Sequence, residues 1–253
     1  MKSKNAGFLL SVMLFIVIVA GCSQASADPS EEAASAEWTE EKLGETEEDL
    51  DAVSERVDDL AQDIRVLSGV PEFSEEPVFP DVNDDYFAFE EIQFLSGQRI
   101  ISGFPDGHFR PGETITRSQT AKMLRAALDL DAPEDYQIKA TDVSDNHHAY
   151  RSLAALEYHG IMTGNDGRLM PSAGLKRSQM AALLVRAYEL PEADKQHTFT
   201  DIDEDYPNFE EINIIADQGI TTETGKAFRP NETTTRAQFS LFMSRAIHDY
   251  FRP

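Results

Sequence analysis

The C-terminal two-thirds of this chain is one sequence unit repeated three times. Each copy is marked by an arginine with a glutamine two residues later, and the arginines are 60 and 59 residues apart: Arg117 with Gln119, Arg177 with Gln179, and Arg236 with Gln238. A unit of this length is too short to bury a sufficient core alone. The repeat therefore predicts three copies packed against one another, with any site built on the arginine present up to three times.

Each unit is predicted to contain two helices. It opens with an aspartate and an aliphatic residue, and an aromatic residue follows eight positions after the aspartate, as in Asp81 and Phe89, Asp142 and Tyr150, and Asp201 and Phe209. Apolar residues at helical spacing continue from the aromatic and, after a glycine-rich turn, again from the arginine. The pattern predicts an all-α, mainly helical fold.

The first residues read as an export signal. Lys2 and Lys4 precede an apolar run over residues 8–20, which is too short for a comfortable membrane span. The run ends at Cys22, the single cysteine, in a Val-Ala-Gly-Cys sequence that resembles the lipoprotein signal-peptidase box. We expect residues 1–21 to be removed as a lipoprotein signal peptide and Cys22 to carry a lipid. The alternative is an ordinary secretory signal beside an unpaired thiol.

Two further segments separate the signal from the repeats. Residues 22–37 have the composition of a flexible acidic linker, and residues 38–70 read as a coiled-coil helix that Gly69 and Pro71 terminate. Its seam consists of two sets of residues spaced by seven: Leu43, Leu50, Val57 and Ile64, then Thr46, Val53, Leu60 and Leu67. Self-association through residues 43–67 and folding of the helix back onto the repeats both remain open. The narrow seam favours a homo-oligomer, and the many flanking acids weaken it.

The repeat resembles the S-layer homology (SLH) family, whose unit reads roughly F-x-D, helix, G-I-I-x-G, turn, F-x-P, then I-T-R-A-E and a second helix. Its counterparts here begin with Phe79-Pro-Asp81 and Ile115-Thr-Arg-Ser-Gln119. The resemblance spans residues 79–253. It implies a three-lobed helical pseudo-trimer with units at 71–134, 135–193 and 194–253. It also implies that grooves between lobes bind secondary cell-wall polysaccharide, often pyruvylated.

The arginines need a compensating partner. Thr116 and Thr235, each three residues before a glutamine, predict capping boxes that put the following arginine at the first helical position. A cation there opposes the helix macrodipole. The partner is either an internal carboxylate, from Asp81, Asp142 or Asp201, or an anionic ligand. Free N–H groups at the helix start and a guanidinium fork both suit a carboxylate, and the resemblance favours the ligand.

Departures from the family pattern refine the site. The usual glutamate of I-T-R-A-E is glutamine in all three units, which removes negative charge beside the arginines. Glycine in the turn lets backbone approach a sugar closely, but the third unit has Glu223 there. We therefore expect the grooves of Arg117 and Arg177 to be competent and the groove with Glu223 to be weakened. The candidate ligand-binding residues are Arg117, Arg177, Arg236, Gln119, Gln179, Gln238, Lys176, Gly103 and Gly164.

Composition limits the partners. The chain has 46 acidic and 22 basic residues, so nucleic acid is not an expected partner. No motif predicts catalysis, a cofactor or a metal site. The resulting hypothesis is a noncatalytic envelope protein, lipid-anchored on the outer face of the cytoplasmic membrane or on an outer membrane, that tethers membrane to wall. The rivals are an oligomeric scaffold that recruits a protein partner through its coiled coil, and an outer-membrane lipoprotein that binds modified peptidoglycan.

Overall fold

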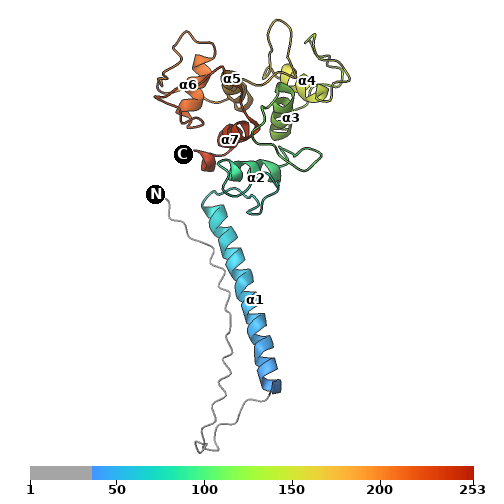
Figure 1. Ribbon diagram of the computed structural model, residues 1–253, viewed down its shortest axis with the longest axis vertical. Helices are drawn as coiled ribbons and strands as arrows, with labels where there is room; N and C mark the ends of the chain where they lie inside the picture. Colours follow the sequence, from blue (N-terminus) through green and yellow to red (C-terminus); the bar gives the residue numbers. More distant parts are fainter. Residues whose placement is uncertain (1–35) are drawn as a thin grey trace, which may run out of the picture. The chain divides into compact units, whose positions relative to one another are not determined.

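The computed structural model describes residues 36–253, so the predicted signal peptide, the lipidation site Cys22 and nearly all of the linker lie outside the described residues. Over this range the chain forms seven α-helices, one short 3-10 helix and no strand, which confirms the all-α class (Figure 1). None of these helices combines the length and the apolar character needed to cross a membrane. The chain divides into two units, Met1–Val57 and Asp58–Pro253, which are described in turn.

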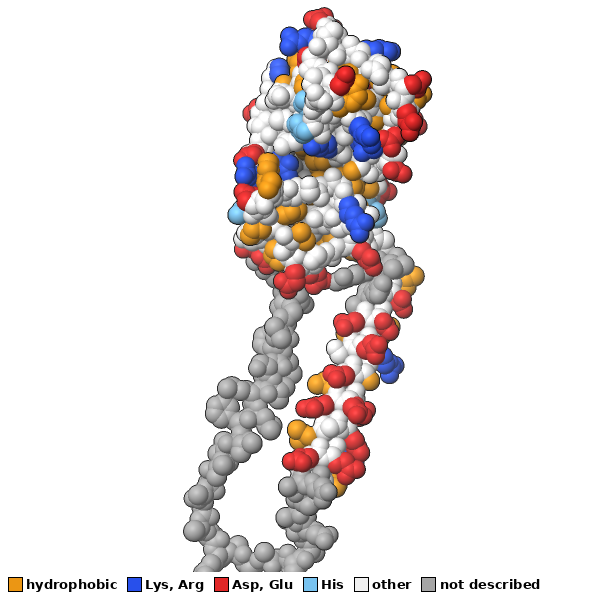
Figure 2. Space-filling model, turned by 90° about the vertical axis from the view of Figure 1, so that its right-hand side faces the viewer, with side chains coloured by type: hydrophobic (Ala, Val, Ile, Leu, Met, Phe, Trp, Pro, Cys, Tyr) orange, Lys and Arg blue, Asp and Glu red, His pale blue; other side chains and the backbone are white. Residues whose placement is uncertain are grey.

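Helix α1 (Ala36–Leu67) covers the segment predicted as a coiled-coil helix. It ends shortly before Gly69, whose φ of +64° suits glycine beyond a helix end. The large apolar residues of the seam, from Leu43 to Leu67, are 55–86% exposed in this single chain. Acidic side chains cover much of the helix surface (Figure 2). The helix is therefore confirmed, and its pairing with another helix stays a prediction.

Each repeat contributes two helices that begin at the predicted residues. The first helix of each unit starts at the aromatic: α2 (Phe89–Gly97), α4 (Tyr150–Tyr158) and α6 (Phe209–Asp217). The second starts at the arginine: α3 (Arg117–Leu128), α5 (Arg177–Tyr188) and α7 (Arg236–Ile247). A 3-10 helix, Asp249–Phe251, follows α7.

The main helix contacts run across repeats. Helix α3 packs on α4, α5 on α6, and α7 on α2 (Figure 1). Each lobe thus combines the second helix of one unit with the first helix of the next. The last pairing joins the third unit to the first and closes the three lobes into a ring. Near the closure, the ring centroid of Phe73 lies 6.4 Å from that of Phe251.

A cycle of backbone hydrogen bonds holds the three units together at the centre. The N–H of Ile115 donates to Thr234 O (2.9 Å), that of Thr234 to Leu175 O (2.8 Å), and that of Leu175 to Ile115 O (3.0 Å). We call these three residues the central hub, and all of them are fully buried. Each lies two residues before its arginine, so the hub distributes the three arginines around one axis.

Candidate functional site

Each arginine reaches from the start of its helix into the neighbouring unit. Its Nε donates to a backbone carbonyl there: Arg117 to Leu169 O (2.6 Å), Arg177 to Phe228 O (2.8 Å) and Arg236 to Phe109 O (2.7 Å). The three side chains are only 2–7% exposed. Burial lowers the pKa of all three guanidinium groups. The arginines are therefore buried residues that join neighbouring units, and their side chains are less accessible than side chains exposed at the start of a helix.

The helix starts do not offer the free N–H groups that the sequence suggested. In α3, Arg117 N donates to Ala173 O (3.0 Å) and Ser118 N to Pro171 O (2.9 Å). Gln119 N donates to Thr116 Oγ1 (3.2 Å). The first two N–H groups of α5 and α7 also donate to carbonyls of a neighbouring unit. This part of the predicted anion site is wrong, because the contacts between units already use those donors.

The glutamines cap their helices as predicted. Their Oε1 atoms accept from the N–H of Thr116 (2.9 Å), Lys176 (3.2 Å) and Thr235 (3.0 Å). The side-chain amide nitrogen then remains available as a donor. Lys176 has no acceptor to complete a capping box, and its Nζ instead donates to Asn231 Oδ1 of the third unit (3.2 Å).

The repeated aspartates hold backbone N–H groups and form no ion pair with the arginines. Asp142 accepts from the N–H groups of Leu169 (2.9 Å) and Met170 (2.8 Å). Met170 has a φ of +51°, a conformation costly for a side-chain-bearing residue. Asp81 and Asp201 bind the equivalent N–H pairs in the other units. Among the described residues, none of the three forms an ion pair with Arg117, Arg177 or Arg236, but the charge of each opposes the lowering of the pKa of the arginine that it faces.

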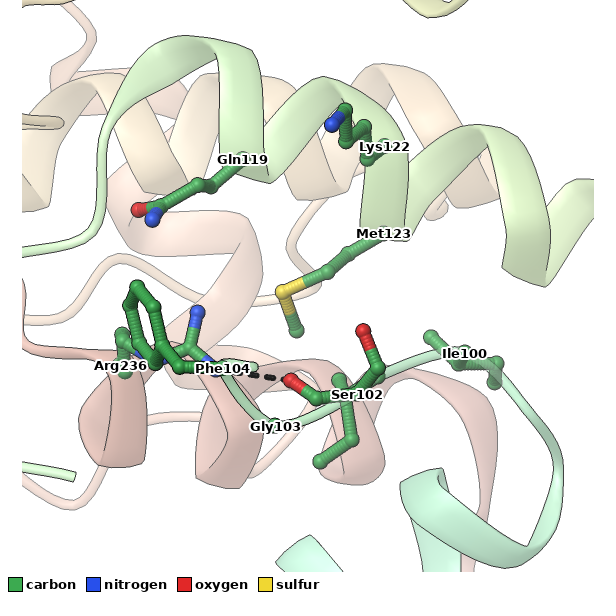
Figure 3. A pocket seen from close by; sticks show the side chains of 9 residues that line it. Ile100, Ser102, Gly103, Phe104, Gln119, Lys122, Met123 and Arg236 are labelled. Atoms are coloured by element: carbon green, nitrogen blue, oxygen red, sulfur yellow. Dashed lines mark hydrogen bonds between the residues drawn. The ribbon is translucent and has the colours of Figure 1, made fainter. Parts of the chain in front are cut away.

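A hollow of about 170 Å³ lies beside Arg236. One wall is the turn of the first unit, where Ser102 O accepts from Arg236 Nη2 at 3.1 Å. Gln119, Lys122 and Met123 of α3 face it from the opposite side (Figure 3). No carboxylate lines this hollow, whose other residues are Ile100, Ile101, Gly103 and Phe104.

An equivalent hollow of about 180 Å³ lies beside Arg117. Its polar residues come from the second turn and the helices behind it, and again none is acidic: Thr163, Asn165, Gln179, Arg186 and Asn208. Gly164 also lines it with a φ of +68°, and a Cβ there would lie 2.3 Å from Arg168 O. Gly164 is therefore required by the backbone, whatever the site binds. Gly103 is less constrained, since a Cβ there would lie 3.0 Å from Phe79 Cε1.

Comparison with known proteins identifies the fold family. The sequence profile of the S-layer homology domain matches residues 78–121, 141–181 and 198–240, which together make up half of the chain. The chain belongs to the S-layer homology family. Each matched segment runs from just before an SLH unit's aspartate to the first turns of its second helix.

Among curated proteins, the SLH repeats resemble those of much longer chains. The S-layer protein sap of Bacillus anthracis is 29% identical over 170 residues, which cover 66% of this chain and 21% of that protein. The S-layer protein of Bacillus licheniformis is 31% identical over 179 residues, covering 69% and 20%. An endoglucanase of Bacillus sp. strain KSM-635 is 30% identical over 188 residues, covering 68% and 19%. The chain thus spans about a fifth of the length of these relatives.

The SLH ring corrects the expected pairing of arginines with turns. Gly103 of the first SLH unit lies with Arg236 and Gly164 of the second with Arg117. Arg177 meets the third unit, where Glu223 pairs with Arg229 at 2.9 Å. Burial and then the charge of Arg229 lower the pKa of Arg177, and Glu223 opposes this together with Glu232 and Asp201, so the charge of Glu223 reaches that guanidinium. The expectation that Arg177 and Glu223 belong to separate grooves is wrong, because each arginine serves the unit that follows its own.

Several residues that line the two hollows were not predicted from the sequence. Ser102 and Thr163 occupy equivalent exposed positions before the turn glycine. Lys122 and Arg186 line the two hollows from α3 and α5. A helical-wheel reading from each arginine would have placed Lys122 and Arg186 on the second helix, but only the docking of neighbouring units shows which side chains face a groove.

Proposed function

We propose that this SLH protein is a noncatalytic envelope protein whose grooves bind anionic, pyruvylated secondary cell-wall polysaccharide. One observation carries the proposal. In a chain with 46 acidic residues, the hollows beside Arg117 and Arg236 have no carboxylate among their lining residues. Two other hollows of the same body are lined by acids, including Glu75, Asp84 and Glu90 in one and Asp131 and Glu134 in the other.

The composition of the two hollows suits an acidic sugar. Each combines an arginine and a glutamine amide with a hydroxyl residue, Ser102 or Thr163. Apolar side chains such as Phe104 and Leu183 can contact the less polar face of a sugar ring. The guanidinium adds charge at low dielectric, where attraction to a carboxylate is stronger than in water. Because its Nε is already bonded, the arginine would act through its terminal nitrogens.

The anchoring part of the proposal rests on the sequence. A lipid on Cys22 would hold the chain at a membrane, and the SLH grooves would hold it at the wall. The protein would then tether the two layers and act by binding, without catalysis. The curated relatives support wall attachment, since two named S-layer proteins and an endoglucanase share these repeats. A Cys22→Ser chain is expected to leave the membrane fraction on cell fractionation.

A charge placed in each hollow tests the function. Ser102→Asp with Thr163→Asp adds one carboxylate per hollow at exposed positions, so the fold should survive. We expect binding to isolated wall sacculi to weaken by at least about tenfold, as an ion repels a like-charged ligand. The measurement is co-sedimentation of the full chain with sacculi. Ser102→Asn with Thr163→Asn, similar in size and neutral, is the matched control.

Two outcomes would reject glycan binding in these hollows. One is unchanged sedimentation of the Asp variant. The other is wild-type sedimentation with sacculi stripped of their secondary polysaccharide, which would instead support the peptidoglycan alternative.

The exposed seam of α1 favours a second role alongside the first. Its apolar residues, more than half exposed, would be covered if α1 helices of several copies paired. We therefore propose homo-oligomerisation through residues 43–67. Recruitment of a different protein is the scaffold alternative. Deleting residues 38–68 separates these roles. If the protein is a tether, the shortened chain should still bind the wall. If it is a scaffold, the deletion should abolish its function whether or not the chain still binds the wall.

A further inference from the structure

Another hollow lies between α3 and α4, next to the hollow beside Arg236, which we call the Arg236 groove. It is open, has a volume of about 550 Å³, and is lined by three basic side chains, Lys122, Arg125 and Arg151, and two histidines, His147 and His148. We call it the α3–α4 basic hollow. Figure 2 shows the face of the SLH repeats that carries these helices, where basic and histidine side chains lie among acidic ones.

The positive charge of this hollow is mostly uncompensated. Lys122 and Arg151 are exposed and form no ion pair among the described residues. Arg125 pairs with Asp131 (2.6 Å), while its Nε is buried without a hydrogen-bond partner. Asp145 is the one carboxylate that lines the hollow.

Two histidines lie beside these cations. Their ring centroids are 4.4 Å apart, and His147 Nδ1 accepts from the N–H of Ala149 (3.1 Å). Burial, then the charges of Lys122 and His147, lower the pKa of His148. A neighbouring anion would reverse the effect of those charges and raise the pKa. His148 can therefore report on occupancy.

The SLH fold itself does not require these basic residues. The other two lobes have uncharged or acidic residues at the equivalent positions. Lys122 corresponds to Ala182 and Leu241, Arg151 to Glu90 and Glu210, and His148 to Phe87 and Pro207. At these three positions, only the lobe formed by α3 and α4 has basic or histidine side chains.

Lys122 connects this hollow to the groove. It lines both the hollow beside Arg236 and the α3–α4 basic hollow. A saccharide chain seated beside Arg236 and leaving over α3 therefore meets Lys122 and then Arg151. An open hollow of this kind encloses a single small ion poorly, but it can hold one charged group of a polymer that is already bound nearby.

We propose that the α3–α4 basic hollow is a subsite for a second anionic substituent of the polysaccharide that occupies the Arg236 groove. The proposal rests on the proposed function. The recognised chemistry is a carboxylate or phosphate on a sugar at least one residue further along the chain. Lys122 and Arg151 would pair with it, so the first lobe would select acidic polymers over isolated acidic sugars.

The test compares fragment lengths on the full-length protein. The probes are short and long size fractions of acidic polysaccharide solubilised from sacculi of the producing organism. Arg151→Gln, a change outside the hollow beside Arg236, should weaken binding of the long fraction about fivefold and change the short fraction less than about twofold. Asp145→Asn should tighten the long fraction. Lys139→Gln, an exposed lysine outside the hollow, should change neither.

A second readout follows His148 by NMR. Its pKa should rise when the long fraction is added and stay unchanged with the short one. Removing phosphate esters enzymatically, or ketal-linked carboxylates by mild acid, identifies the substituent by which treatment abolishes the rise.

The outcomes separate the two proposals. Equal loss for both fractions, or no loss for the long one, overturns the subsite while groove binding stands, provided that Ser102→Asp still weakens both fractions. Failure of the wild-type protein to bind either fraction overturns groove binding and the subsite together.

Discussion

Asp142 shows how a single residue links the fold to the groove. It fixes the N–H groups of Leu169 and Met170, and Leu169 in turn presents the carbonyl that accepts from Arg117 Nε. Burial alone would raise the pKa of Asp142, but hydrogen bonds from backbone N–H groups, including those of Leu169 and Met170, together with the charge of Arg168 hold this pKa below its ordinary value. The ionised carboxylate is thus favoured in the folded state, and its contribution is present above the unfolded pKa of about 4.

Replacing Asp142 by asparagine should destabilise the protein by about 2 kcal/mol near neutral pH. The side-chain amide nitrogen of asparagine cannot accept a hydrogen bond, so one of the two backbone N–H groups loses its acceptor. The difference from wild type should shrink as pH falls through the lowered folded pKa, where the wild-type carboxyl also becomes protonated. Urea unfolding at a series of pH values measures both effects.

Asp145→Asn supplies the control, since it removes the same charge from an exposed position of the same unit and should cost under about 0.5 kcal/mol. A similar cost for the two variants would show that the Asp142 hydrogen bonds add little stability.

At the scale of one element, the apolar seam of α1 has no packing partner that covers it among the described residues of a single chain. The residues at the seven-residue spacing lie on one side of the helix, and half of the residues outside this seam are acidic. The helix carries Lys42 paired with Glu45, a surface contact worth little on its own. Burial of the seam against other copies would supply the stabilisation that the isolated helix does not have.

Val57→Asp should dissociate the oligomer, because it places a charge in the apolar seam. Ala52→Asp makes the same residue type at an exposed position outside the seam and should leave the oligomer intact. Light scattering coupled to size exclusion gives the mass of each variant, at low and at moderate salt. A monomeric wild type, or equal behaviour of the two variants, would contradict self-association.

At the scale of the SLH body, stability depends on ring closure. Helix α7 packs on α2, and the hub takes one hydrogen-bonding residue from each unit. No unit therefore keeps its partners when another is removed, and unfolding should occur in one cooperative transition. The proximity of Phe73 to Phe251 also places the two ends of the body close together.

A circular permutant should consequently retain the fold. The new chain would join Pro253 to Glu72 through a short glycine-serine linker and begin at Glu192, in the exposed connection between α5 and α6. We expect a melting temperature within about 10 °C of the unpermuted body, by calorimetry, since such sites tolerate new termini. Truncation before Arg236 should instead unfold the whole body. A stable truncated protein, or several separate transitions, would show that the ring is dispensable.

The sequence by itself determined the helix starts, because aromatic spacing, capping residues and turn glycines act within a few positions of one another. The same local signals established the all-α class, the α1 seam and the resemblance to the SLH family. Glutamine capping of α3 and α7 was also predictable from Thr116 and Thr235, since a capping box spans four residues.

Only the tertiary structure decided which arginine meets which turn. Arg177 and Glu223 are 46 residues apart, and their proximity follows from the docking of the second unit on the third, which no local pattern encodes. Docking between units also consumed the helix-start N–H groups and buried the arginines, and it assembled two hollows without carboxylates. These features depend on the packing of segments distant in the chain, and for that reason they first became visible in the folded molecule.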